Sequence, residues 1–159
     1  MEFTKTCTVQ KHINLNTFSE QDTALIKLAE EAAGNAHAPY SRFHVGAALR
    51  FEDGATFLGS NQENPAYPSG MCAERVAVFA AKAQFPNKLV ETLAISVEPH
   101  NSNGILNQAF TPPCGGCLQV LADLETRQKN TLKILIKSPD GACFEIDGIK
   151  NLLPFKFEL

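Results

Sequence analysis

Three cysteines and one glutamate are the residues in this 159-residue chain whose types and spacing could do chemistry. Cys72 stands two residues before Glu74, in the stretch CAER. Cys114 and Cys117 are separated by two glycines, in the stretch PCGGC. In a reducing compartment, clustered cysteines are more often metal ligands or catalytic groups than disulfide partners. The spacing therefore points to a metal site or a redox site.

Both cysteine groups are predicted to lie at the N-termini of helices. Unsatisfied backbone N–H groups and the helix dipole stabilise negative charge there, so thiols ionise more easily. Thiolates are the form that binds zinc. Cys114 and Cys117 can chelate one ion from a single helical turn, and Cys72 would supply a third ligand from another element. Helical spacing of apolar residues follows each group: Val76, Ala77, Phe79, Ala80 and Ala83 after Cys72, and Leu118, Leu121 and Leu124 after Cys114.

Three protein ligands with one open position are typical of a catalytic zinc ion rather than a structural one. Zinc lowers the pKa of a water molecule in the open position towards 7, which supplies hydroxide at neutral pH. A further group must then move protons between that water and the substrate. Glu74, two residues from a ligand, is predicted to be this general acid/base.

Other interpretations of the cysteines remain open at this point. A C-x-x-C pair also occurs in redox dithiols and in structural zinc sites. Cys7 or Cys143 could complete a four-thiolate structural site. The four histidines show no ligand spacing relative to one another and are predicted not to bind metal: His12, His37, His44 and His100.

Alternating helical and extended patterns predict one α/β domain over residues 1–159, with helices covering a sheet. Five strands are expected, over 44–51, 55–60, 89–97, 131–137 and 142–146. A first helix is expected to end near Gly34 and to begin either at a Thr17–Glu20 capping box or at Ser19. Two more helices follow the cysteine groups, and a short last helix is expected within 147–154.

Composition and charge exclude several classes of protein. The net charge of −3 argues against a general affinity for nucleic acid or acidic membranes. No apolar run approaches the roughly 18 residues of a membrane span. Because the N-terminal residues do not resemble a secretion signal, we expect a cytoplasmic protein.

At the level of motifs, the chain resembles the zinc-dependent cytidine deaminases. The match is carried by Cys72-Ala73-Glu74 with PCGGC, by PYSRFHVGAAL (39–49), by GSNQENPAYPSGMCAER (59–75) and by the closing LLPFKF (152–157). A cysteine as the first ligand is similar to the small, homotetrameric enzymes of nucleoside salvage. The resemblance implies a three-layer α/β/α sandwich with a mixed five-stranded sheet and one zinc ion per subunit. It also implies hydrolysis of cytidine and 2'-deoxycytidine to uridine or deoxyuridine and ammonia, by zinc-activated hydroxide.

The same resemblance assigns roles to individual residues. It implies that Cys72, Cys114 and Cys117 hold zinc and that Glu74 is the general acid/base. Arg75 would donate to the thiolates and offset their charge. The substrate-binding residues would be Phe43 at the pyrimidine, Asn61 and Glu63 at the ribose hydroxyls, and the Ala73 backbone at the base. Tyr67 and Phe157 would reach the site of a neighbouring subunit in a homotetramer, or in a homodimer.

Three departures from the family pattern leave alternatives open. Leu118 stands where the family usually has arginine, Pro65 follows N-x-E-N where a small residue is usual, and the 99–113 connection is long. An altered loop would favour a deaminase of a modified cytosine nucleoside such as blasticidin S. A structural-zinc module or catalytically silent binder is the alternative outside the enzymes. A thiol–disulfide oxidoreductase is the weakest interpretation, since it gives Glu74 no role.

Overall fold

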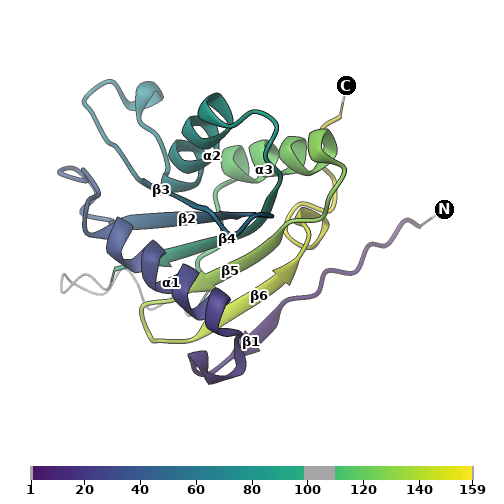
Figure 1. The fold of residues 1–159 in the computed structure, drawn as a ribbon. Helices are drawn as coiled ribbons and strands as arrows, with labels where there is room; N and C mark the ends of the chain where they lie inside the picture. The colour runs from purple at the N-terminus through teal and green to yellow at the C-terminus, as the bar shows by residue number, and fades with distance from the viewer. Residues whose placement is uncertain (1, 99–109, 159) are drawn as a thin grey trace.

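The computed structural model describes residues 2–98 and 110–158 and contains a mixed sheet in the order β1-β6-β5-β4-β2-β3 (Figure 1). β4 and β5 are parallel, and every other neighbouring pair is antiparallel. The strands are β1 (Gln10–His12), β2 (Val45–Phe51), β3 (Thr56–Ser60), β4 (Val90–Val97), β5 (Lys133–Lys137) and β6 (Cys143–Asp147). The helices are α1 (Glu20–Ala33), α2 (Ala73–Gln84) and α3 (Gly115–Gln128), with short 3-10 turns at Leu15–Thr17, Tyr67–Ser69 and Ile149–Asn151.

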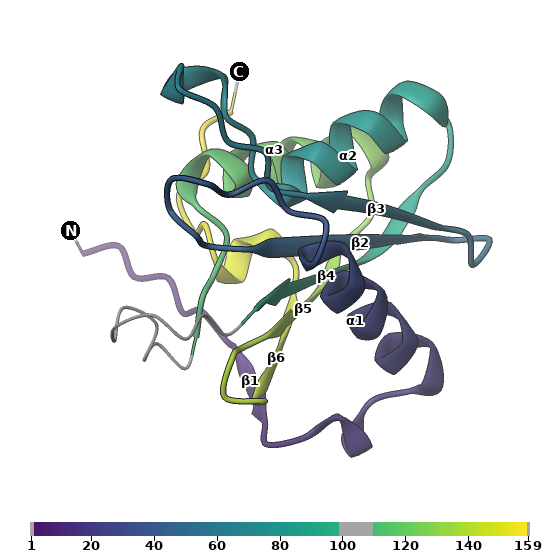
Figure 2. The same cartoon turned by 90° about the vertical axis from the view of Figure 1, so that its left-hand side faces the viewer.

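The sheet is the middle layer of three. Helix α1 covers one face, and α2 and α3 lie side by side on the other (Figures 1 and 2). Each face has its own buried apolar cluster, which for α1 includes Leu25, Ala48 and Leu135, and for α2 and α3 includes Ala77 and Leu121. The predicted three-layer α/β/α architecture is confirmed.

The expected number of strands was wrong, because the described residues form a sheet of six strands rather than five. The additional strand, β1, is three residues long and pairs antiparallel with β6 at the edge, with Lys11 opposite Phe144. A segment this short has no period-2 pattern of its own. Its extended form depends on hydrogen bonds to a strand more than 130 residues further along the chain, which local sequence cannot report.

Helix α1 begins at Ser19, whose Oγ accepts a hydrogen bond from the Asp22 N–H at 3.1 Å. The alternative cap, Thr17, instead bonds through its hydroxyl to His12 Nδ1 at 2.9 Å. The helix packs very closely on β2, since a Cβ built at Gly46 would lie 2.0 Å from the Ala29 carbonyl oxygen. Only glycine permits this approach of helix to strand.

The two cysteine groups come together because of how β4 connects to β5. The chain leaves β4 at Val97 and returns through α3, so that α3 begins beside α2 on the same face of the sheet. Most of the long 99–113 connection, including His100, lies outside the described residues. Within the described ranges, no helix is long and apolar enough to cross a membrane.

Candidate active site

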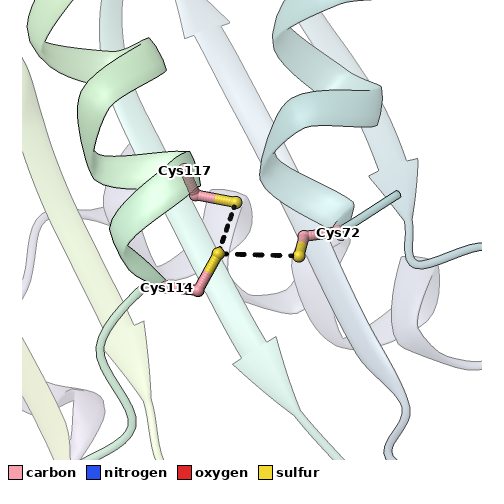
Figure 3. A group of neighbouring side chains, drawn as sticks. All are labelled: Cys72, Cys114 and Cys117. Carbon is pink, nitrogen blue, oxygen red and sulfur yellow. Dashed lines mark hydrogen bonds between the residues drawn. The ribbon is translucent and has the colours of Figure 1, made fainter. Parts of the chain in front are cut away.

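Two helix N-termini converge on one point, and a cysteine is the N-cap residue of each. Cys72 caps α2 and Cys114 caps α3, both with extended backbone, and Cys117 lies in the first turn of α3 (Figure 3). The positive ends of the two helix dipoles therefore face the same small volume. The sequence prediction that both groups begin helices is confirmed.

The three sulfur atoms have the spacing of ligands on one tetrahedral ion. Sγ of Cys72 is 3.8 Å from Sγ of Cys114, which is 3.5 Å from Sγ of Cys117. All three lie within 4.8 Å of one another. A tetrahedral zinc ion with Zn–S bonds of about 2.3 Å separates its sulfur ligands by about 3.8 Å. The donor set and its geometry therefore both fit zinc.

The surroundings of Cys72 favour its thiolate. The pKa of Cys72 is lowered to about 5, first by hydrogen bonding to the Cys117 thiol and then by Arg75. Nη2 of Arg75 lies 3.6 Å from the Cys72 sulfur. Three thiolates and Zn²⁺ sum to one negative charge, so a guanidinium here reduces the net charge of the site.

The remaining cysteines and described histidines lie elsewhere. Cys143 is buried in the cluster under α1, on the opposite face of the sheet, and Cys7 is exposed beside the Lys150 carbonyl. In residues 2–98 and 110–158, the group that could hold a metal contains three cysteines and no fourth ligand. The four-thiolate alternative has no support, and the group contains none of the described histidines.

A cavity of about 660 Å³ opens beside the sulfur atoms. Glu74 lines it although only 5% of the residue is exposed, and burial raises the pKa of its carboxyl group. A buried carboxyl group whose pKa is raised is a stronger base than a solvent-exposed one, which suits a group that takes up and releases protons during a reaction. The other predicted residues at this cavity are Phe43, Asn61, Glu63, Tyr67, Ala73, Cys72 and Cys114.

The loop that follows α1 holds the polar residues of the cavity in place. The His37 N–H donates to the Asn61 carbonyl at 3.0 Å, and the Glu63 N–H donates to the His37 carbonyl at 2.8 Å. The Asn61 side chain accepts from the Val45 N–H at 2.8 Å and donates to the Phe43 carbonyl at 2.7 Å. Asn61 therefore joins the end of β3 to the start of β2.

Several residues at this cavity were not predicted from the sequence. They include Tyr40, Ser41, Met71, Ile95, Thr111 and Pro112. Tyr40 and Ser41 belong to the PYSRF stretch that carried the family resemblance, so their position beside Phe43 was a signal that could have been used. Ile95 lies in a run of buried residues, 92–97, where nothing local distinguishes a cavity wall from the core.

Two predicted features lie apart from the cavity in this chain. Phe157 is 68% exposed and lies next to Gln119, on the outer side of α3. Leu118, which replaces the usual arginine, is 8% exposed and belongs to the apolar cluster under α2 and α3. In this chain the substituted position therefore contributes to the core instead of adding charge at the metal site.

An α/β/α sandwich with a cluster of three thiols beside a cavity, and a buried carboxyl group that lines it, defines the class of the zinc-dependent hydrolases. The model of the family described as "Cytidine and deoxycytidylate deaminase zinc-binding region" matches residues 19–132, and the chain belongs to this family.

Individual relatives agree with that assignment. The chain is 43% identical over 133 residues to a cytidine deaminase of Halalkalibacterium halodurans, covering 84% of this chain and 91% of the relative. A crystal structure of cytidine deaminase from Burkholderia pseudomallei superposes with a TM-score of 0.68 at 34% identity, over 88% of this chain and 100% of the other. One from Mycobacterium tuberculosis gives 0.63 at 33% identity, over 86% and 97%.

Proposed function

We propose that this protein is a zinc-dependent cytidine deaminase that hydrolyses cytidine to uridine and ammonia. The observation that carries the proposal is the set of three sulfur atoms with tetrahedral spacing next to a buried glutamate, at one end of a nucleoside-sized cavity. The cytidine deaminases among its relatives support cytosine as the base. They do not favour the modified-cytosine alternative.

Zinc would be held by Cys72, Cys114 and Cys117. When bound, it supplies hydroxide near neutral pH by lowering the pKa of a water molecule towards 7. Arg75 stabilises the negative charge of the thiolates, and the two helix N-termini add to this effect.

Glu74 moves the protons in the proposed mechanism. Its carboxylate takes a proton from the attacking water and gives it to N3 of the cytosine ring as the oxygen adds at C4. It then takes the second proton, from the new hydroxyl group on C4, and passes it to the amine, so that the C4–N4 bond breaks, ammonia leaves and the carboxylate is regenerated. The buried position of Glu74 at the cavity supports this role, because burial raises the pKa of its carboxyl group and makes the carboxylate a better proton acceptor.

Nucleoside recognition is assigned to other residues of the cavity wall. Asn61 and Glu63 bind the ribose hydroxyls, Phe43 lies against the pyrimidine, and the Ala73 backbone contacts the base. All four residues line the same cavity as Glu74, which supports their roles. 2'-Deoxycytidine is the second proposed substrate, since it keeps the base and the 3'-hydroxyl.

We further propose a homotetramer in which Phe157, and Tyr67 in addition to lining its own chain's cavity, reach a neighbouring subunit's site. Large exposed apolar side chains support association between copies, because association would remove their apolar surface from water. Tyr67 and Phe157 are 77% and 68% exposed, and Phe79 on α2 is 46% exposed. The five unpaired cysteines support a cytoplasmic enzyme of pyrimidine salvage, since free thiols persist in a reducing compartment.

The test is turnover of cytidine by the zinc-loaded protein. Absorbance should change as cytidine becomes uridine, and a separate assay should find one ammonia per uridine. Protein from which a chelator has removed zinc is the control and should be inactive until zinc is restored. Absence of turnover in folded, zinc-containing protein would contradict the proposal.

A further inference from the structure

The Ser41 hydroxyl joins two of the proposed substrate-binding residues. It donates a hydrogen bond to Oε1 of Glu63 and accepts one from the Phe43 N–H at 3.0 Å. Ser41 and Phe43 belong to the loop between α1 and β2, whereas Glu63 follows β3. One oxygen atom therefore connects the residue assigned to the ribose with the residue assigned to the base.

The loop between α1 and β2 also donates hydrogen bonds to the other carboxylate oxygen of Glu63. Oε2 accepts from the Tyr40 N–H at 3.0 Å and from the Ser41 N–H at 3.2 Å. An ionised carboxylate has about four acceptor sites, and these three donors leave one for a ligand hydroxyl. The pKa of Glu63 is lowered, chiefly by the hydrogen bond from Ser41, so the carboxylate stays ionised and remains an acceptor.

The residue after Ser41 has an unfavourable backbone conformation, which hydrogen bonds on both sides of it hold in place. Arg42 has a φ of 56°, in the left-handed region, which costs a residue with a side chain roughly 1–2 kcal/mol. Its N–H donates to the Ala38 carbonyl at 2.9 Å, and Ser41 holds the chain on either side. Phe43 is held from the opposite direction by the Asn61 amide.

We propose that Ser41 is a positioning residue that sets the Glu63 carboxylate and the Phe43 ring in one arrangement matched to a nucleoside. This inference rests on the proposed function, in particular on ribose binding by Glu63. A nucleoside presents its sugar hydroxyls and its flat base in a restricted relative orientation. Fixing both contacts before binding avoids ordering them during binding, which raises affinity without a new contact.

The test compares substrates that differ only in the sugar. Ser41→Ala should lower kcat/KM for cytidine at least tenfold relative to kcat/KM for 2',3'-dideoxycytidine, which lacks the hydroxyls that Glu63 would bind. The loss should appear mainly in KM, because ribose contacts exist in the ground state and the transition state alike. Ser41→Thr, which keeps the hydroxyl, should restore the wild-type ratio to within about twofold.

Ser60→Ala is a matched control. The Ser60 hydroxyl also joins two chain segments, by donating to the Asn35 carbonyl at 3.2 Å, but Ser60 does not line the cavity. Its removal should leave the substrate ratio unchanged. Thermal unfolding should show that all three variants are folded, since Ser41 is exposed and its loop is outside the main core.

Glu63→Gln separates failure of this inference from failure of the proposed function. If Glu63→Gln lowers the substrate ratio and Ser41→Ala does not, the role of Ser41 is wrong and ribose binding by Glu63 stands. If the wild type shows no dependence on the sugar hydroxyls, or if Glu63→Gln leaves the substrate ratio unchanged, ribose recognition by Glu63 is wrong and the inference is overturned with it. Cytidine turnover by the wild type tests the reaction independently of both.

Discussion

Nη2 of Arg75 lies 3.6 Å from Sγ of Cys72, three residues away at the same end of α2. The helix thus presents a metal ligand, a buried acid and a compensating cation within its first turn. The pKa of Arg75 is raised, chiefly by its hydrogen bond to Cys72. The Cys72 sulfur therefore stabilises the guanidinium cation, and the cation in turn offsets the negative charge of the thiolate.

Replacing Arg75 with glutamine should weaken zinc binding. Outer-shell partners of metal ligands typically change metal affinity or activity by about 10–100-fold, and we expect the zinc dissociation constant to rise within that range. Competition with a chromophoric chelator measures the change. Arg127→Gln is the control, because Arg127 pairs with Asp123 on the exposed surface of α3. Unchanged zinc affinity in Arg75→Gln would contradict the charge-compensation role.

Glu74→Gln should keep its zinc and lose its activity. The substitution leaves all three sulfur ligands in place but removes the group that carries protons. Loss of general acid/base catalysis typically lowers kcat by about 10²–10⁴-fold. Metal content by mass spectrometry and cytidine turnover on the same sample provide the measurement. Turnover near that of the wild type would remove Glu74 from the mechanism.

Asp22 should make the stability of the fold depend on acid pH. It is 4% exposed and accepts from Arg50 Nη1 at 2.9 Å and from Lys133 Nζ at 2.8 Å. Burial acts to raise its pKa, but the hydrogen bonds from Lys133 and Arg50 outweigh burial and lower it. The stabilisation is therefore complete above the unfolded-state pKa of about 3.9 and is lost as the pH falls through the lower folded-state pKa.

Urea unfolding of Asp22→Asn tests this expectation. At pH 7 the variant should lose about 3 kcal/mol, because the buried Arg50 loses its buried carboxylate partner and keeps only the exposed Glu91. The difference from the wild type should shrink as the pH is lowered below about 4. Asp123→Asn, in an exposed pair, should change stability by less than about 1 kcal/mol. A difference that does not vary with pH would mean that packing, and not charge, determines the effect.

Comparing Gly46→Ala with Gly54→Ala should separate the cost of a steric clash from the cost of an unfavourable backbone conformation. The added Cβ would lie 2.0 Å from the Ala29 carbonyl oxygen and 2.3 Å from the Ala33 nitrogen, so α1 must move off β2. We expect a loss of about 3 kcal/mol or more in urea unfolding. Gly54→Ala, where φ is 83° and nothing lies within 4 Å, should cost only about 1–2 kcal/mol. Equal losses would argue against the close contact between helix and strand.

Gln119 should hold the C-terminal segment on α3. Its amide accepts from the Phe157 N–H at 3.1 Å and donates to the Phe157 carbonyl at 2.9 Å. Without these two bonds, chymotrypsin should cut near Phe157 about tenfold faster in Gln119→Ala. Gln128 makes the same pair of bonds to Val90, so Gln128→Ala is a matched control that should leave the segment protected. If chymotrypsin cut both variants equally fast, the proposal that Gln119 holds the C-terminal segment on α3 would be wrong.

Local patterns in the chain were sufficient for much of this description. The helical periodicity after Cys72 and Cys114 predicted α2 and α3, and five of the six strands carried their own extended pattern. The metal ligands were also predictable, because cysteine types, a two-residue gap and a helix N-terminus are all short-range features. In each case, a few neighbouring residues determine the backbone conformation and the chemistry together.

The tertiary structure alone decided which distant groups meet. Residues 10–12 form strand β1 because they hydrogen-bond to β6. Leu118 is a core residue because α3 packs on the sheet, and Cys143 lies on the face opposite the metal site. Ser41 connects Phe43 to Glu63 only because a loop from one part of the chain meets the end of β3. Such contacts depend on the order of strands and the burial of whole faces, which are long-range properties of the fold. The residue types in the site were therefore determined by the sequence, and their relative positions by packing across the sheet.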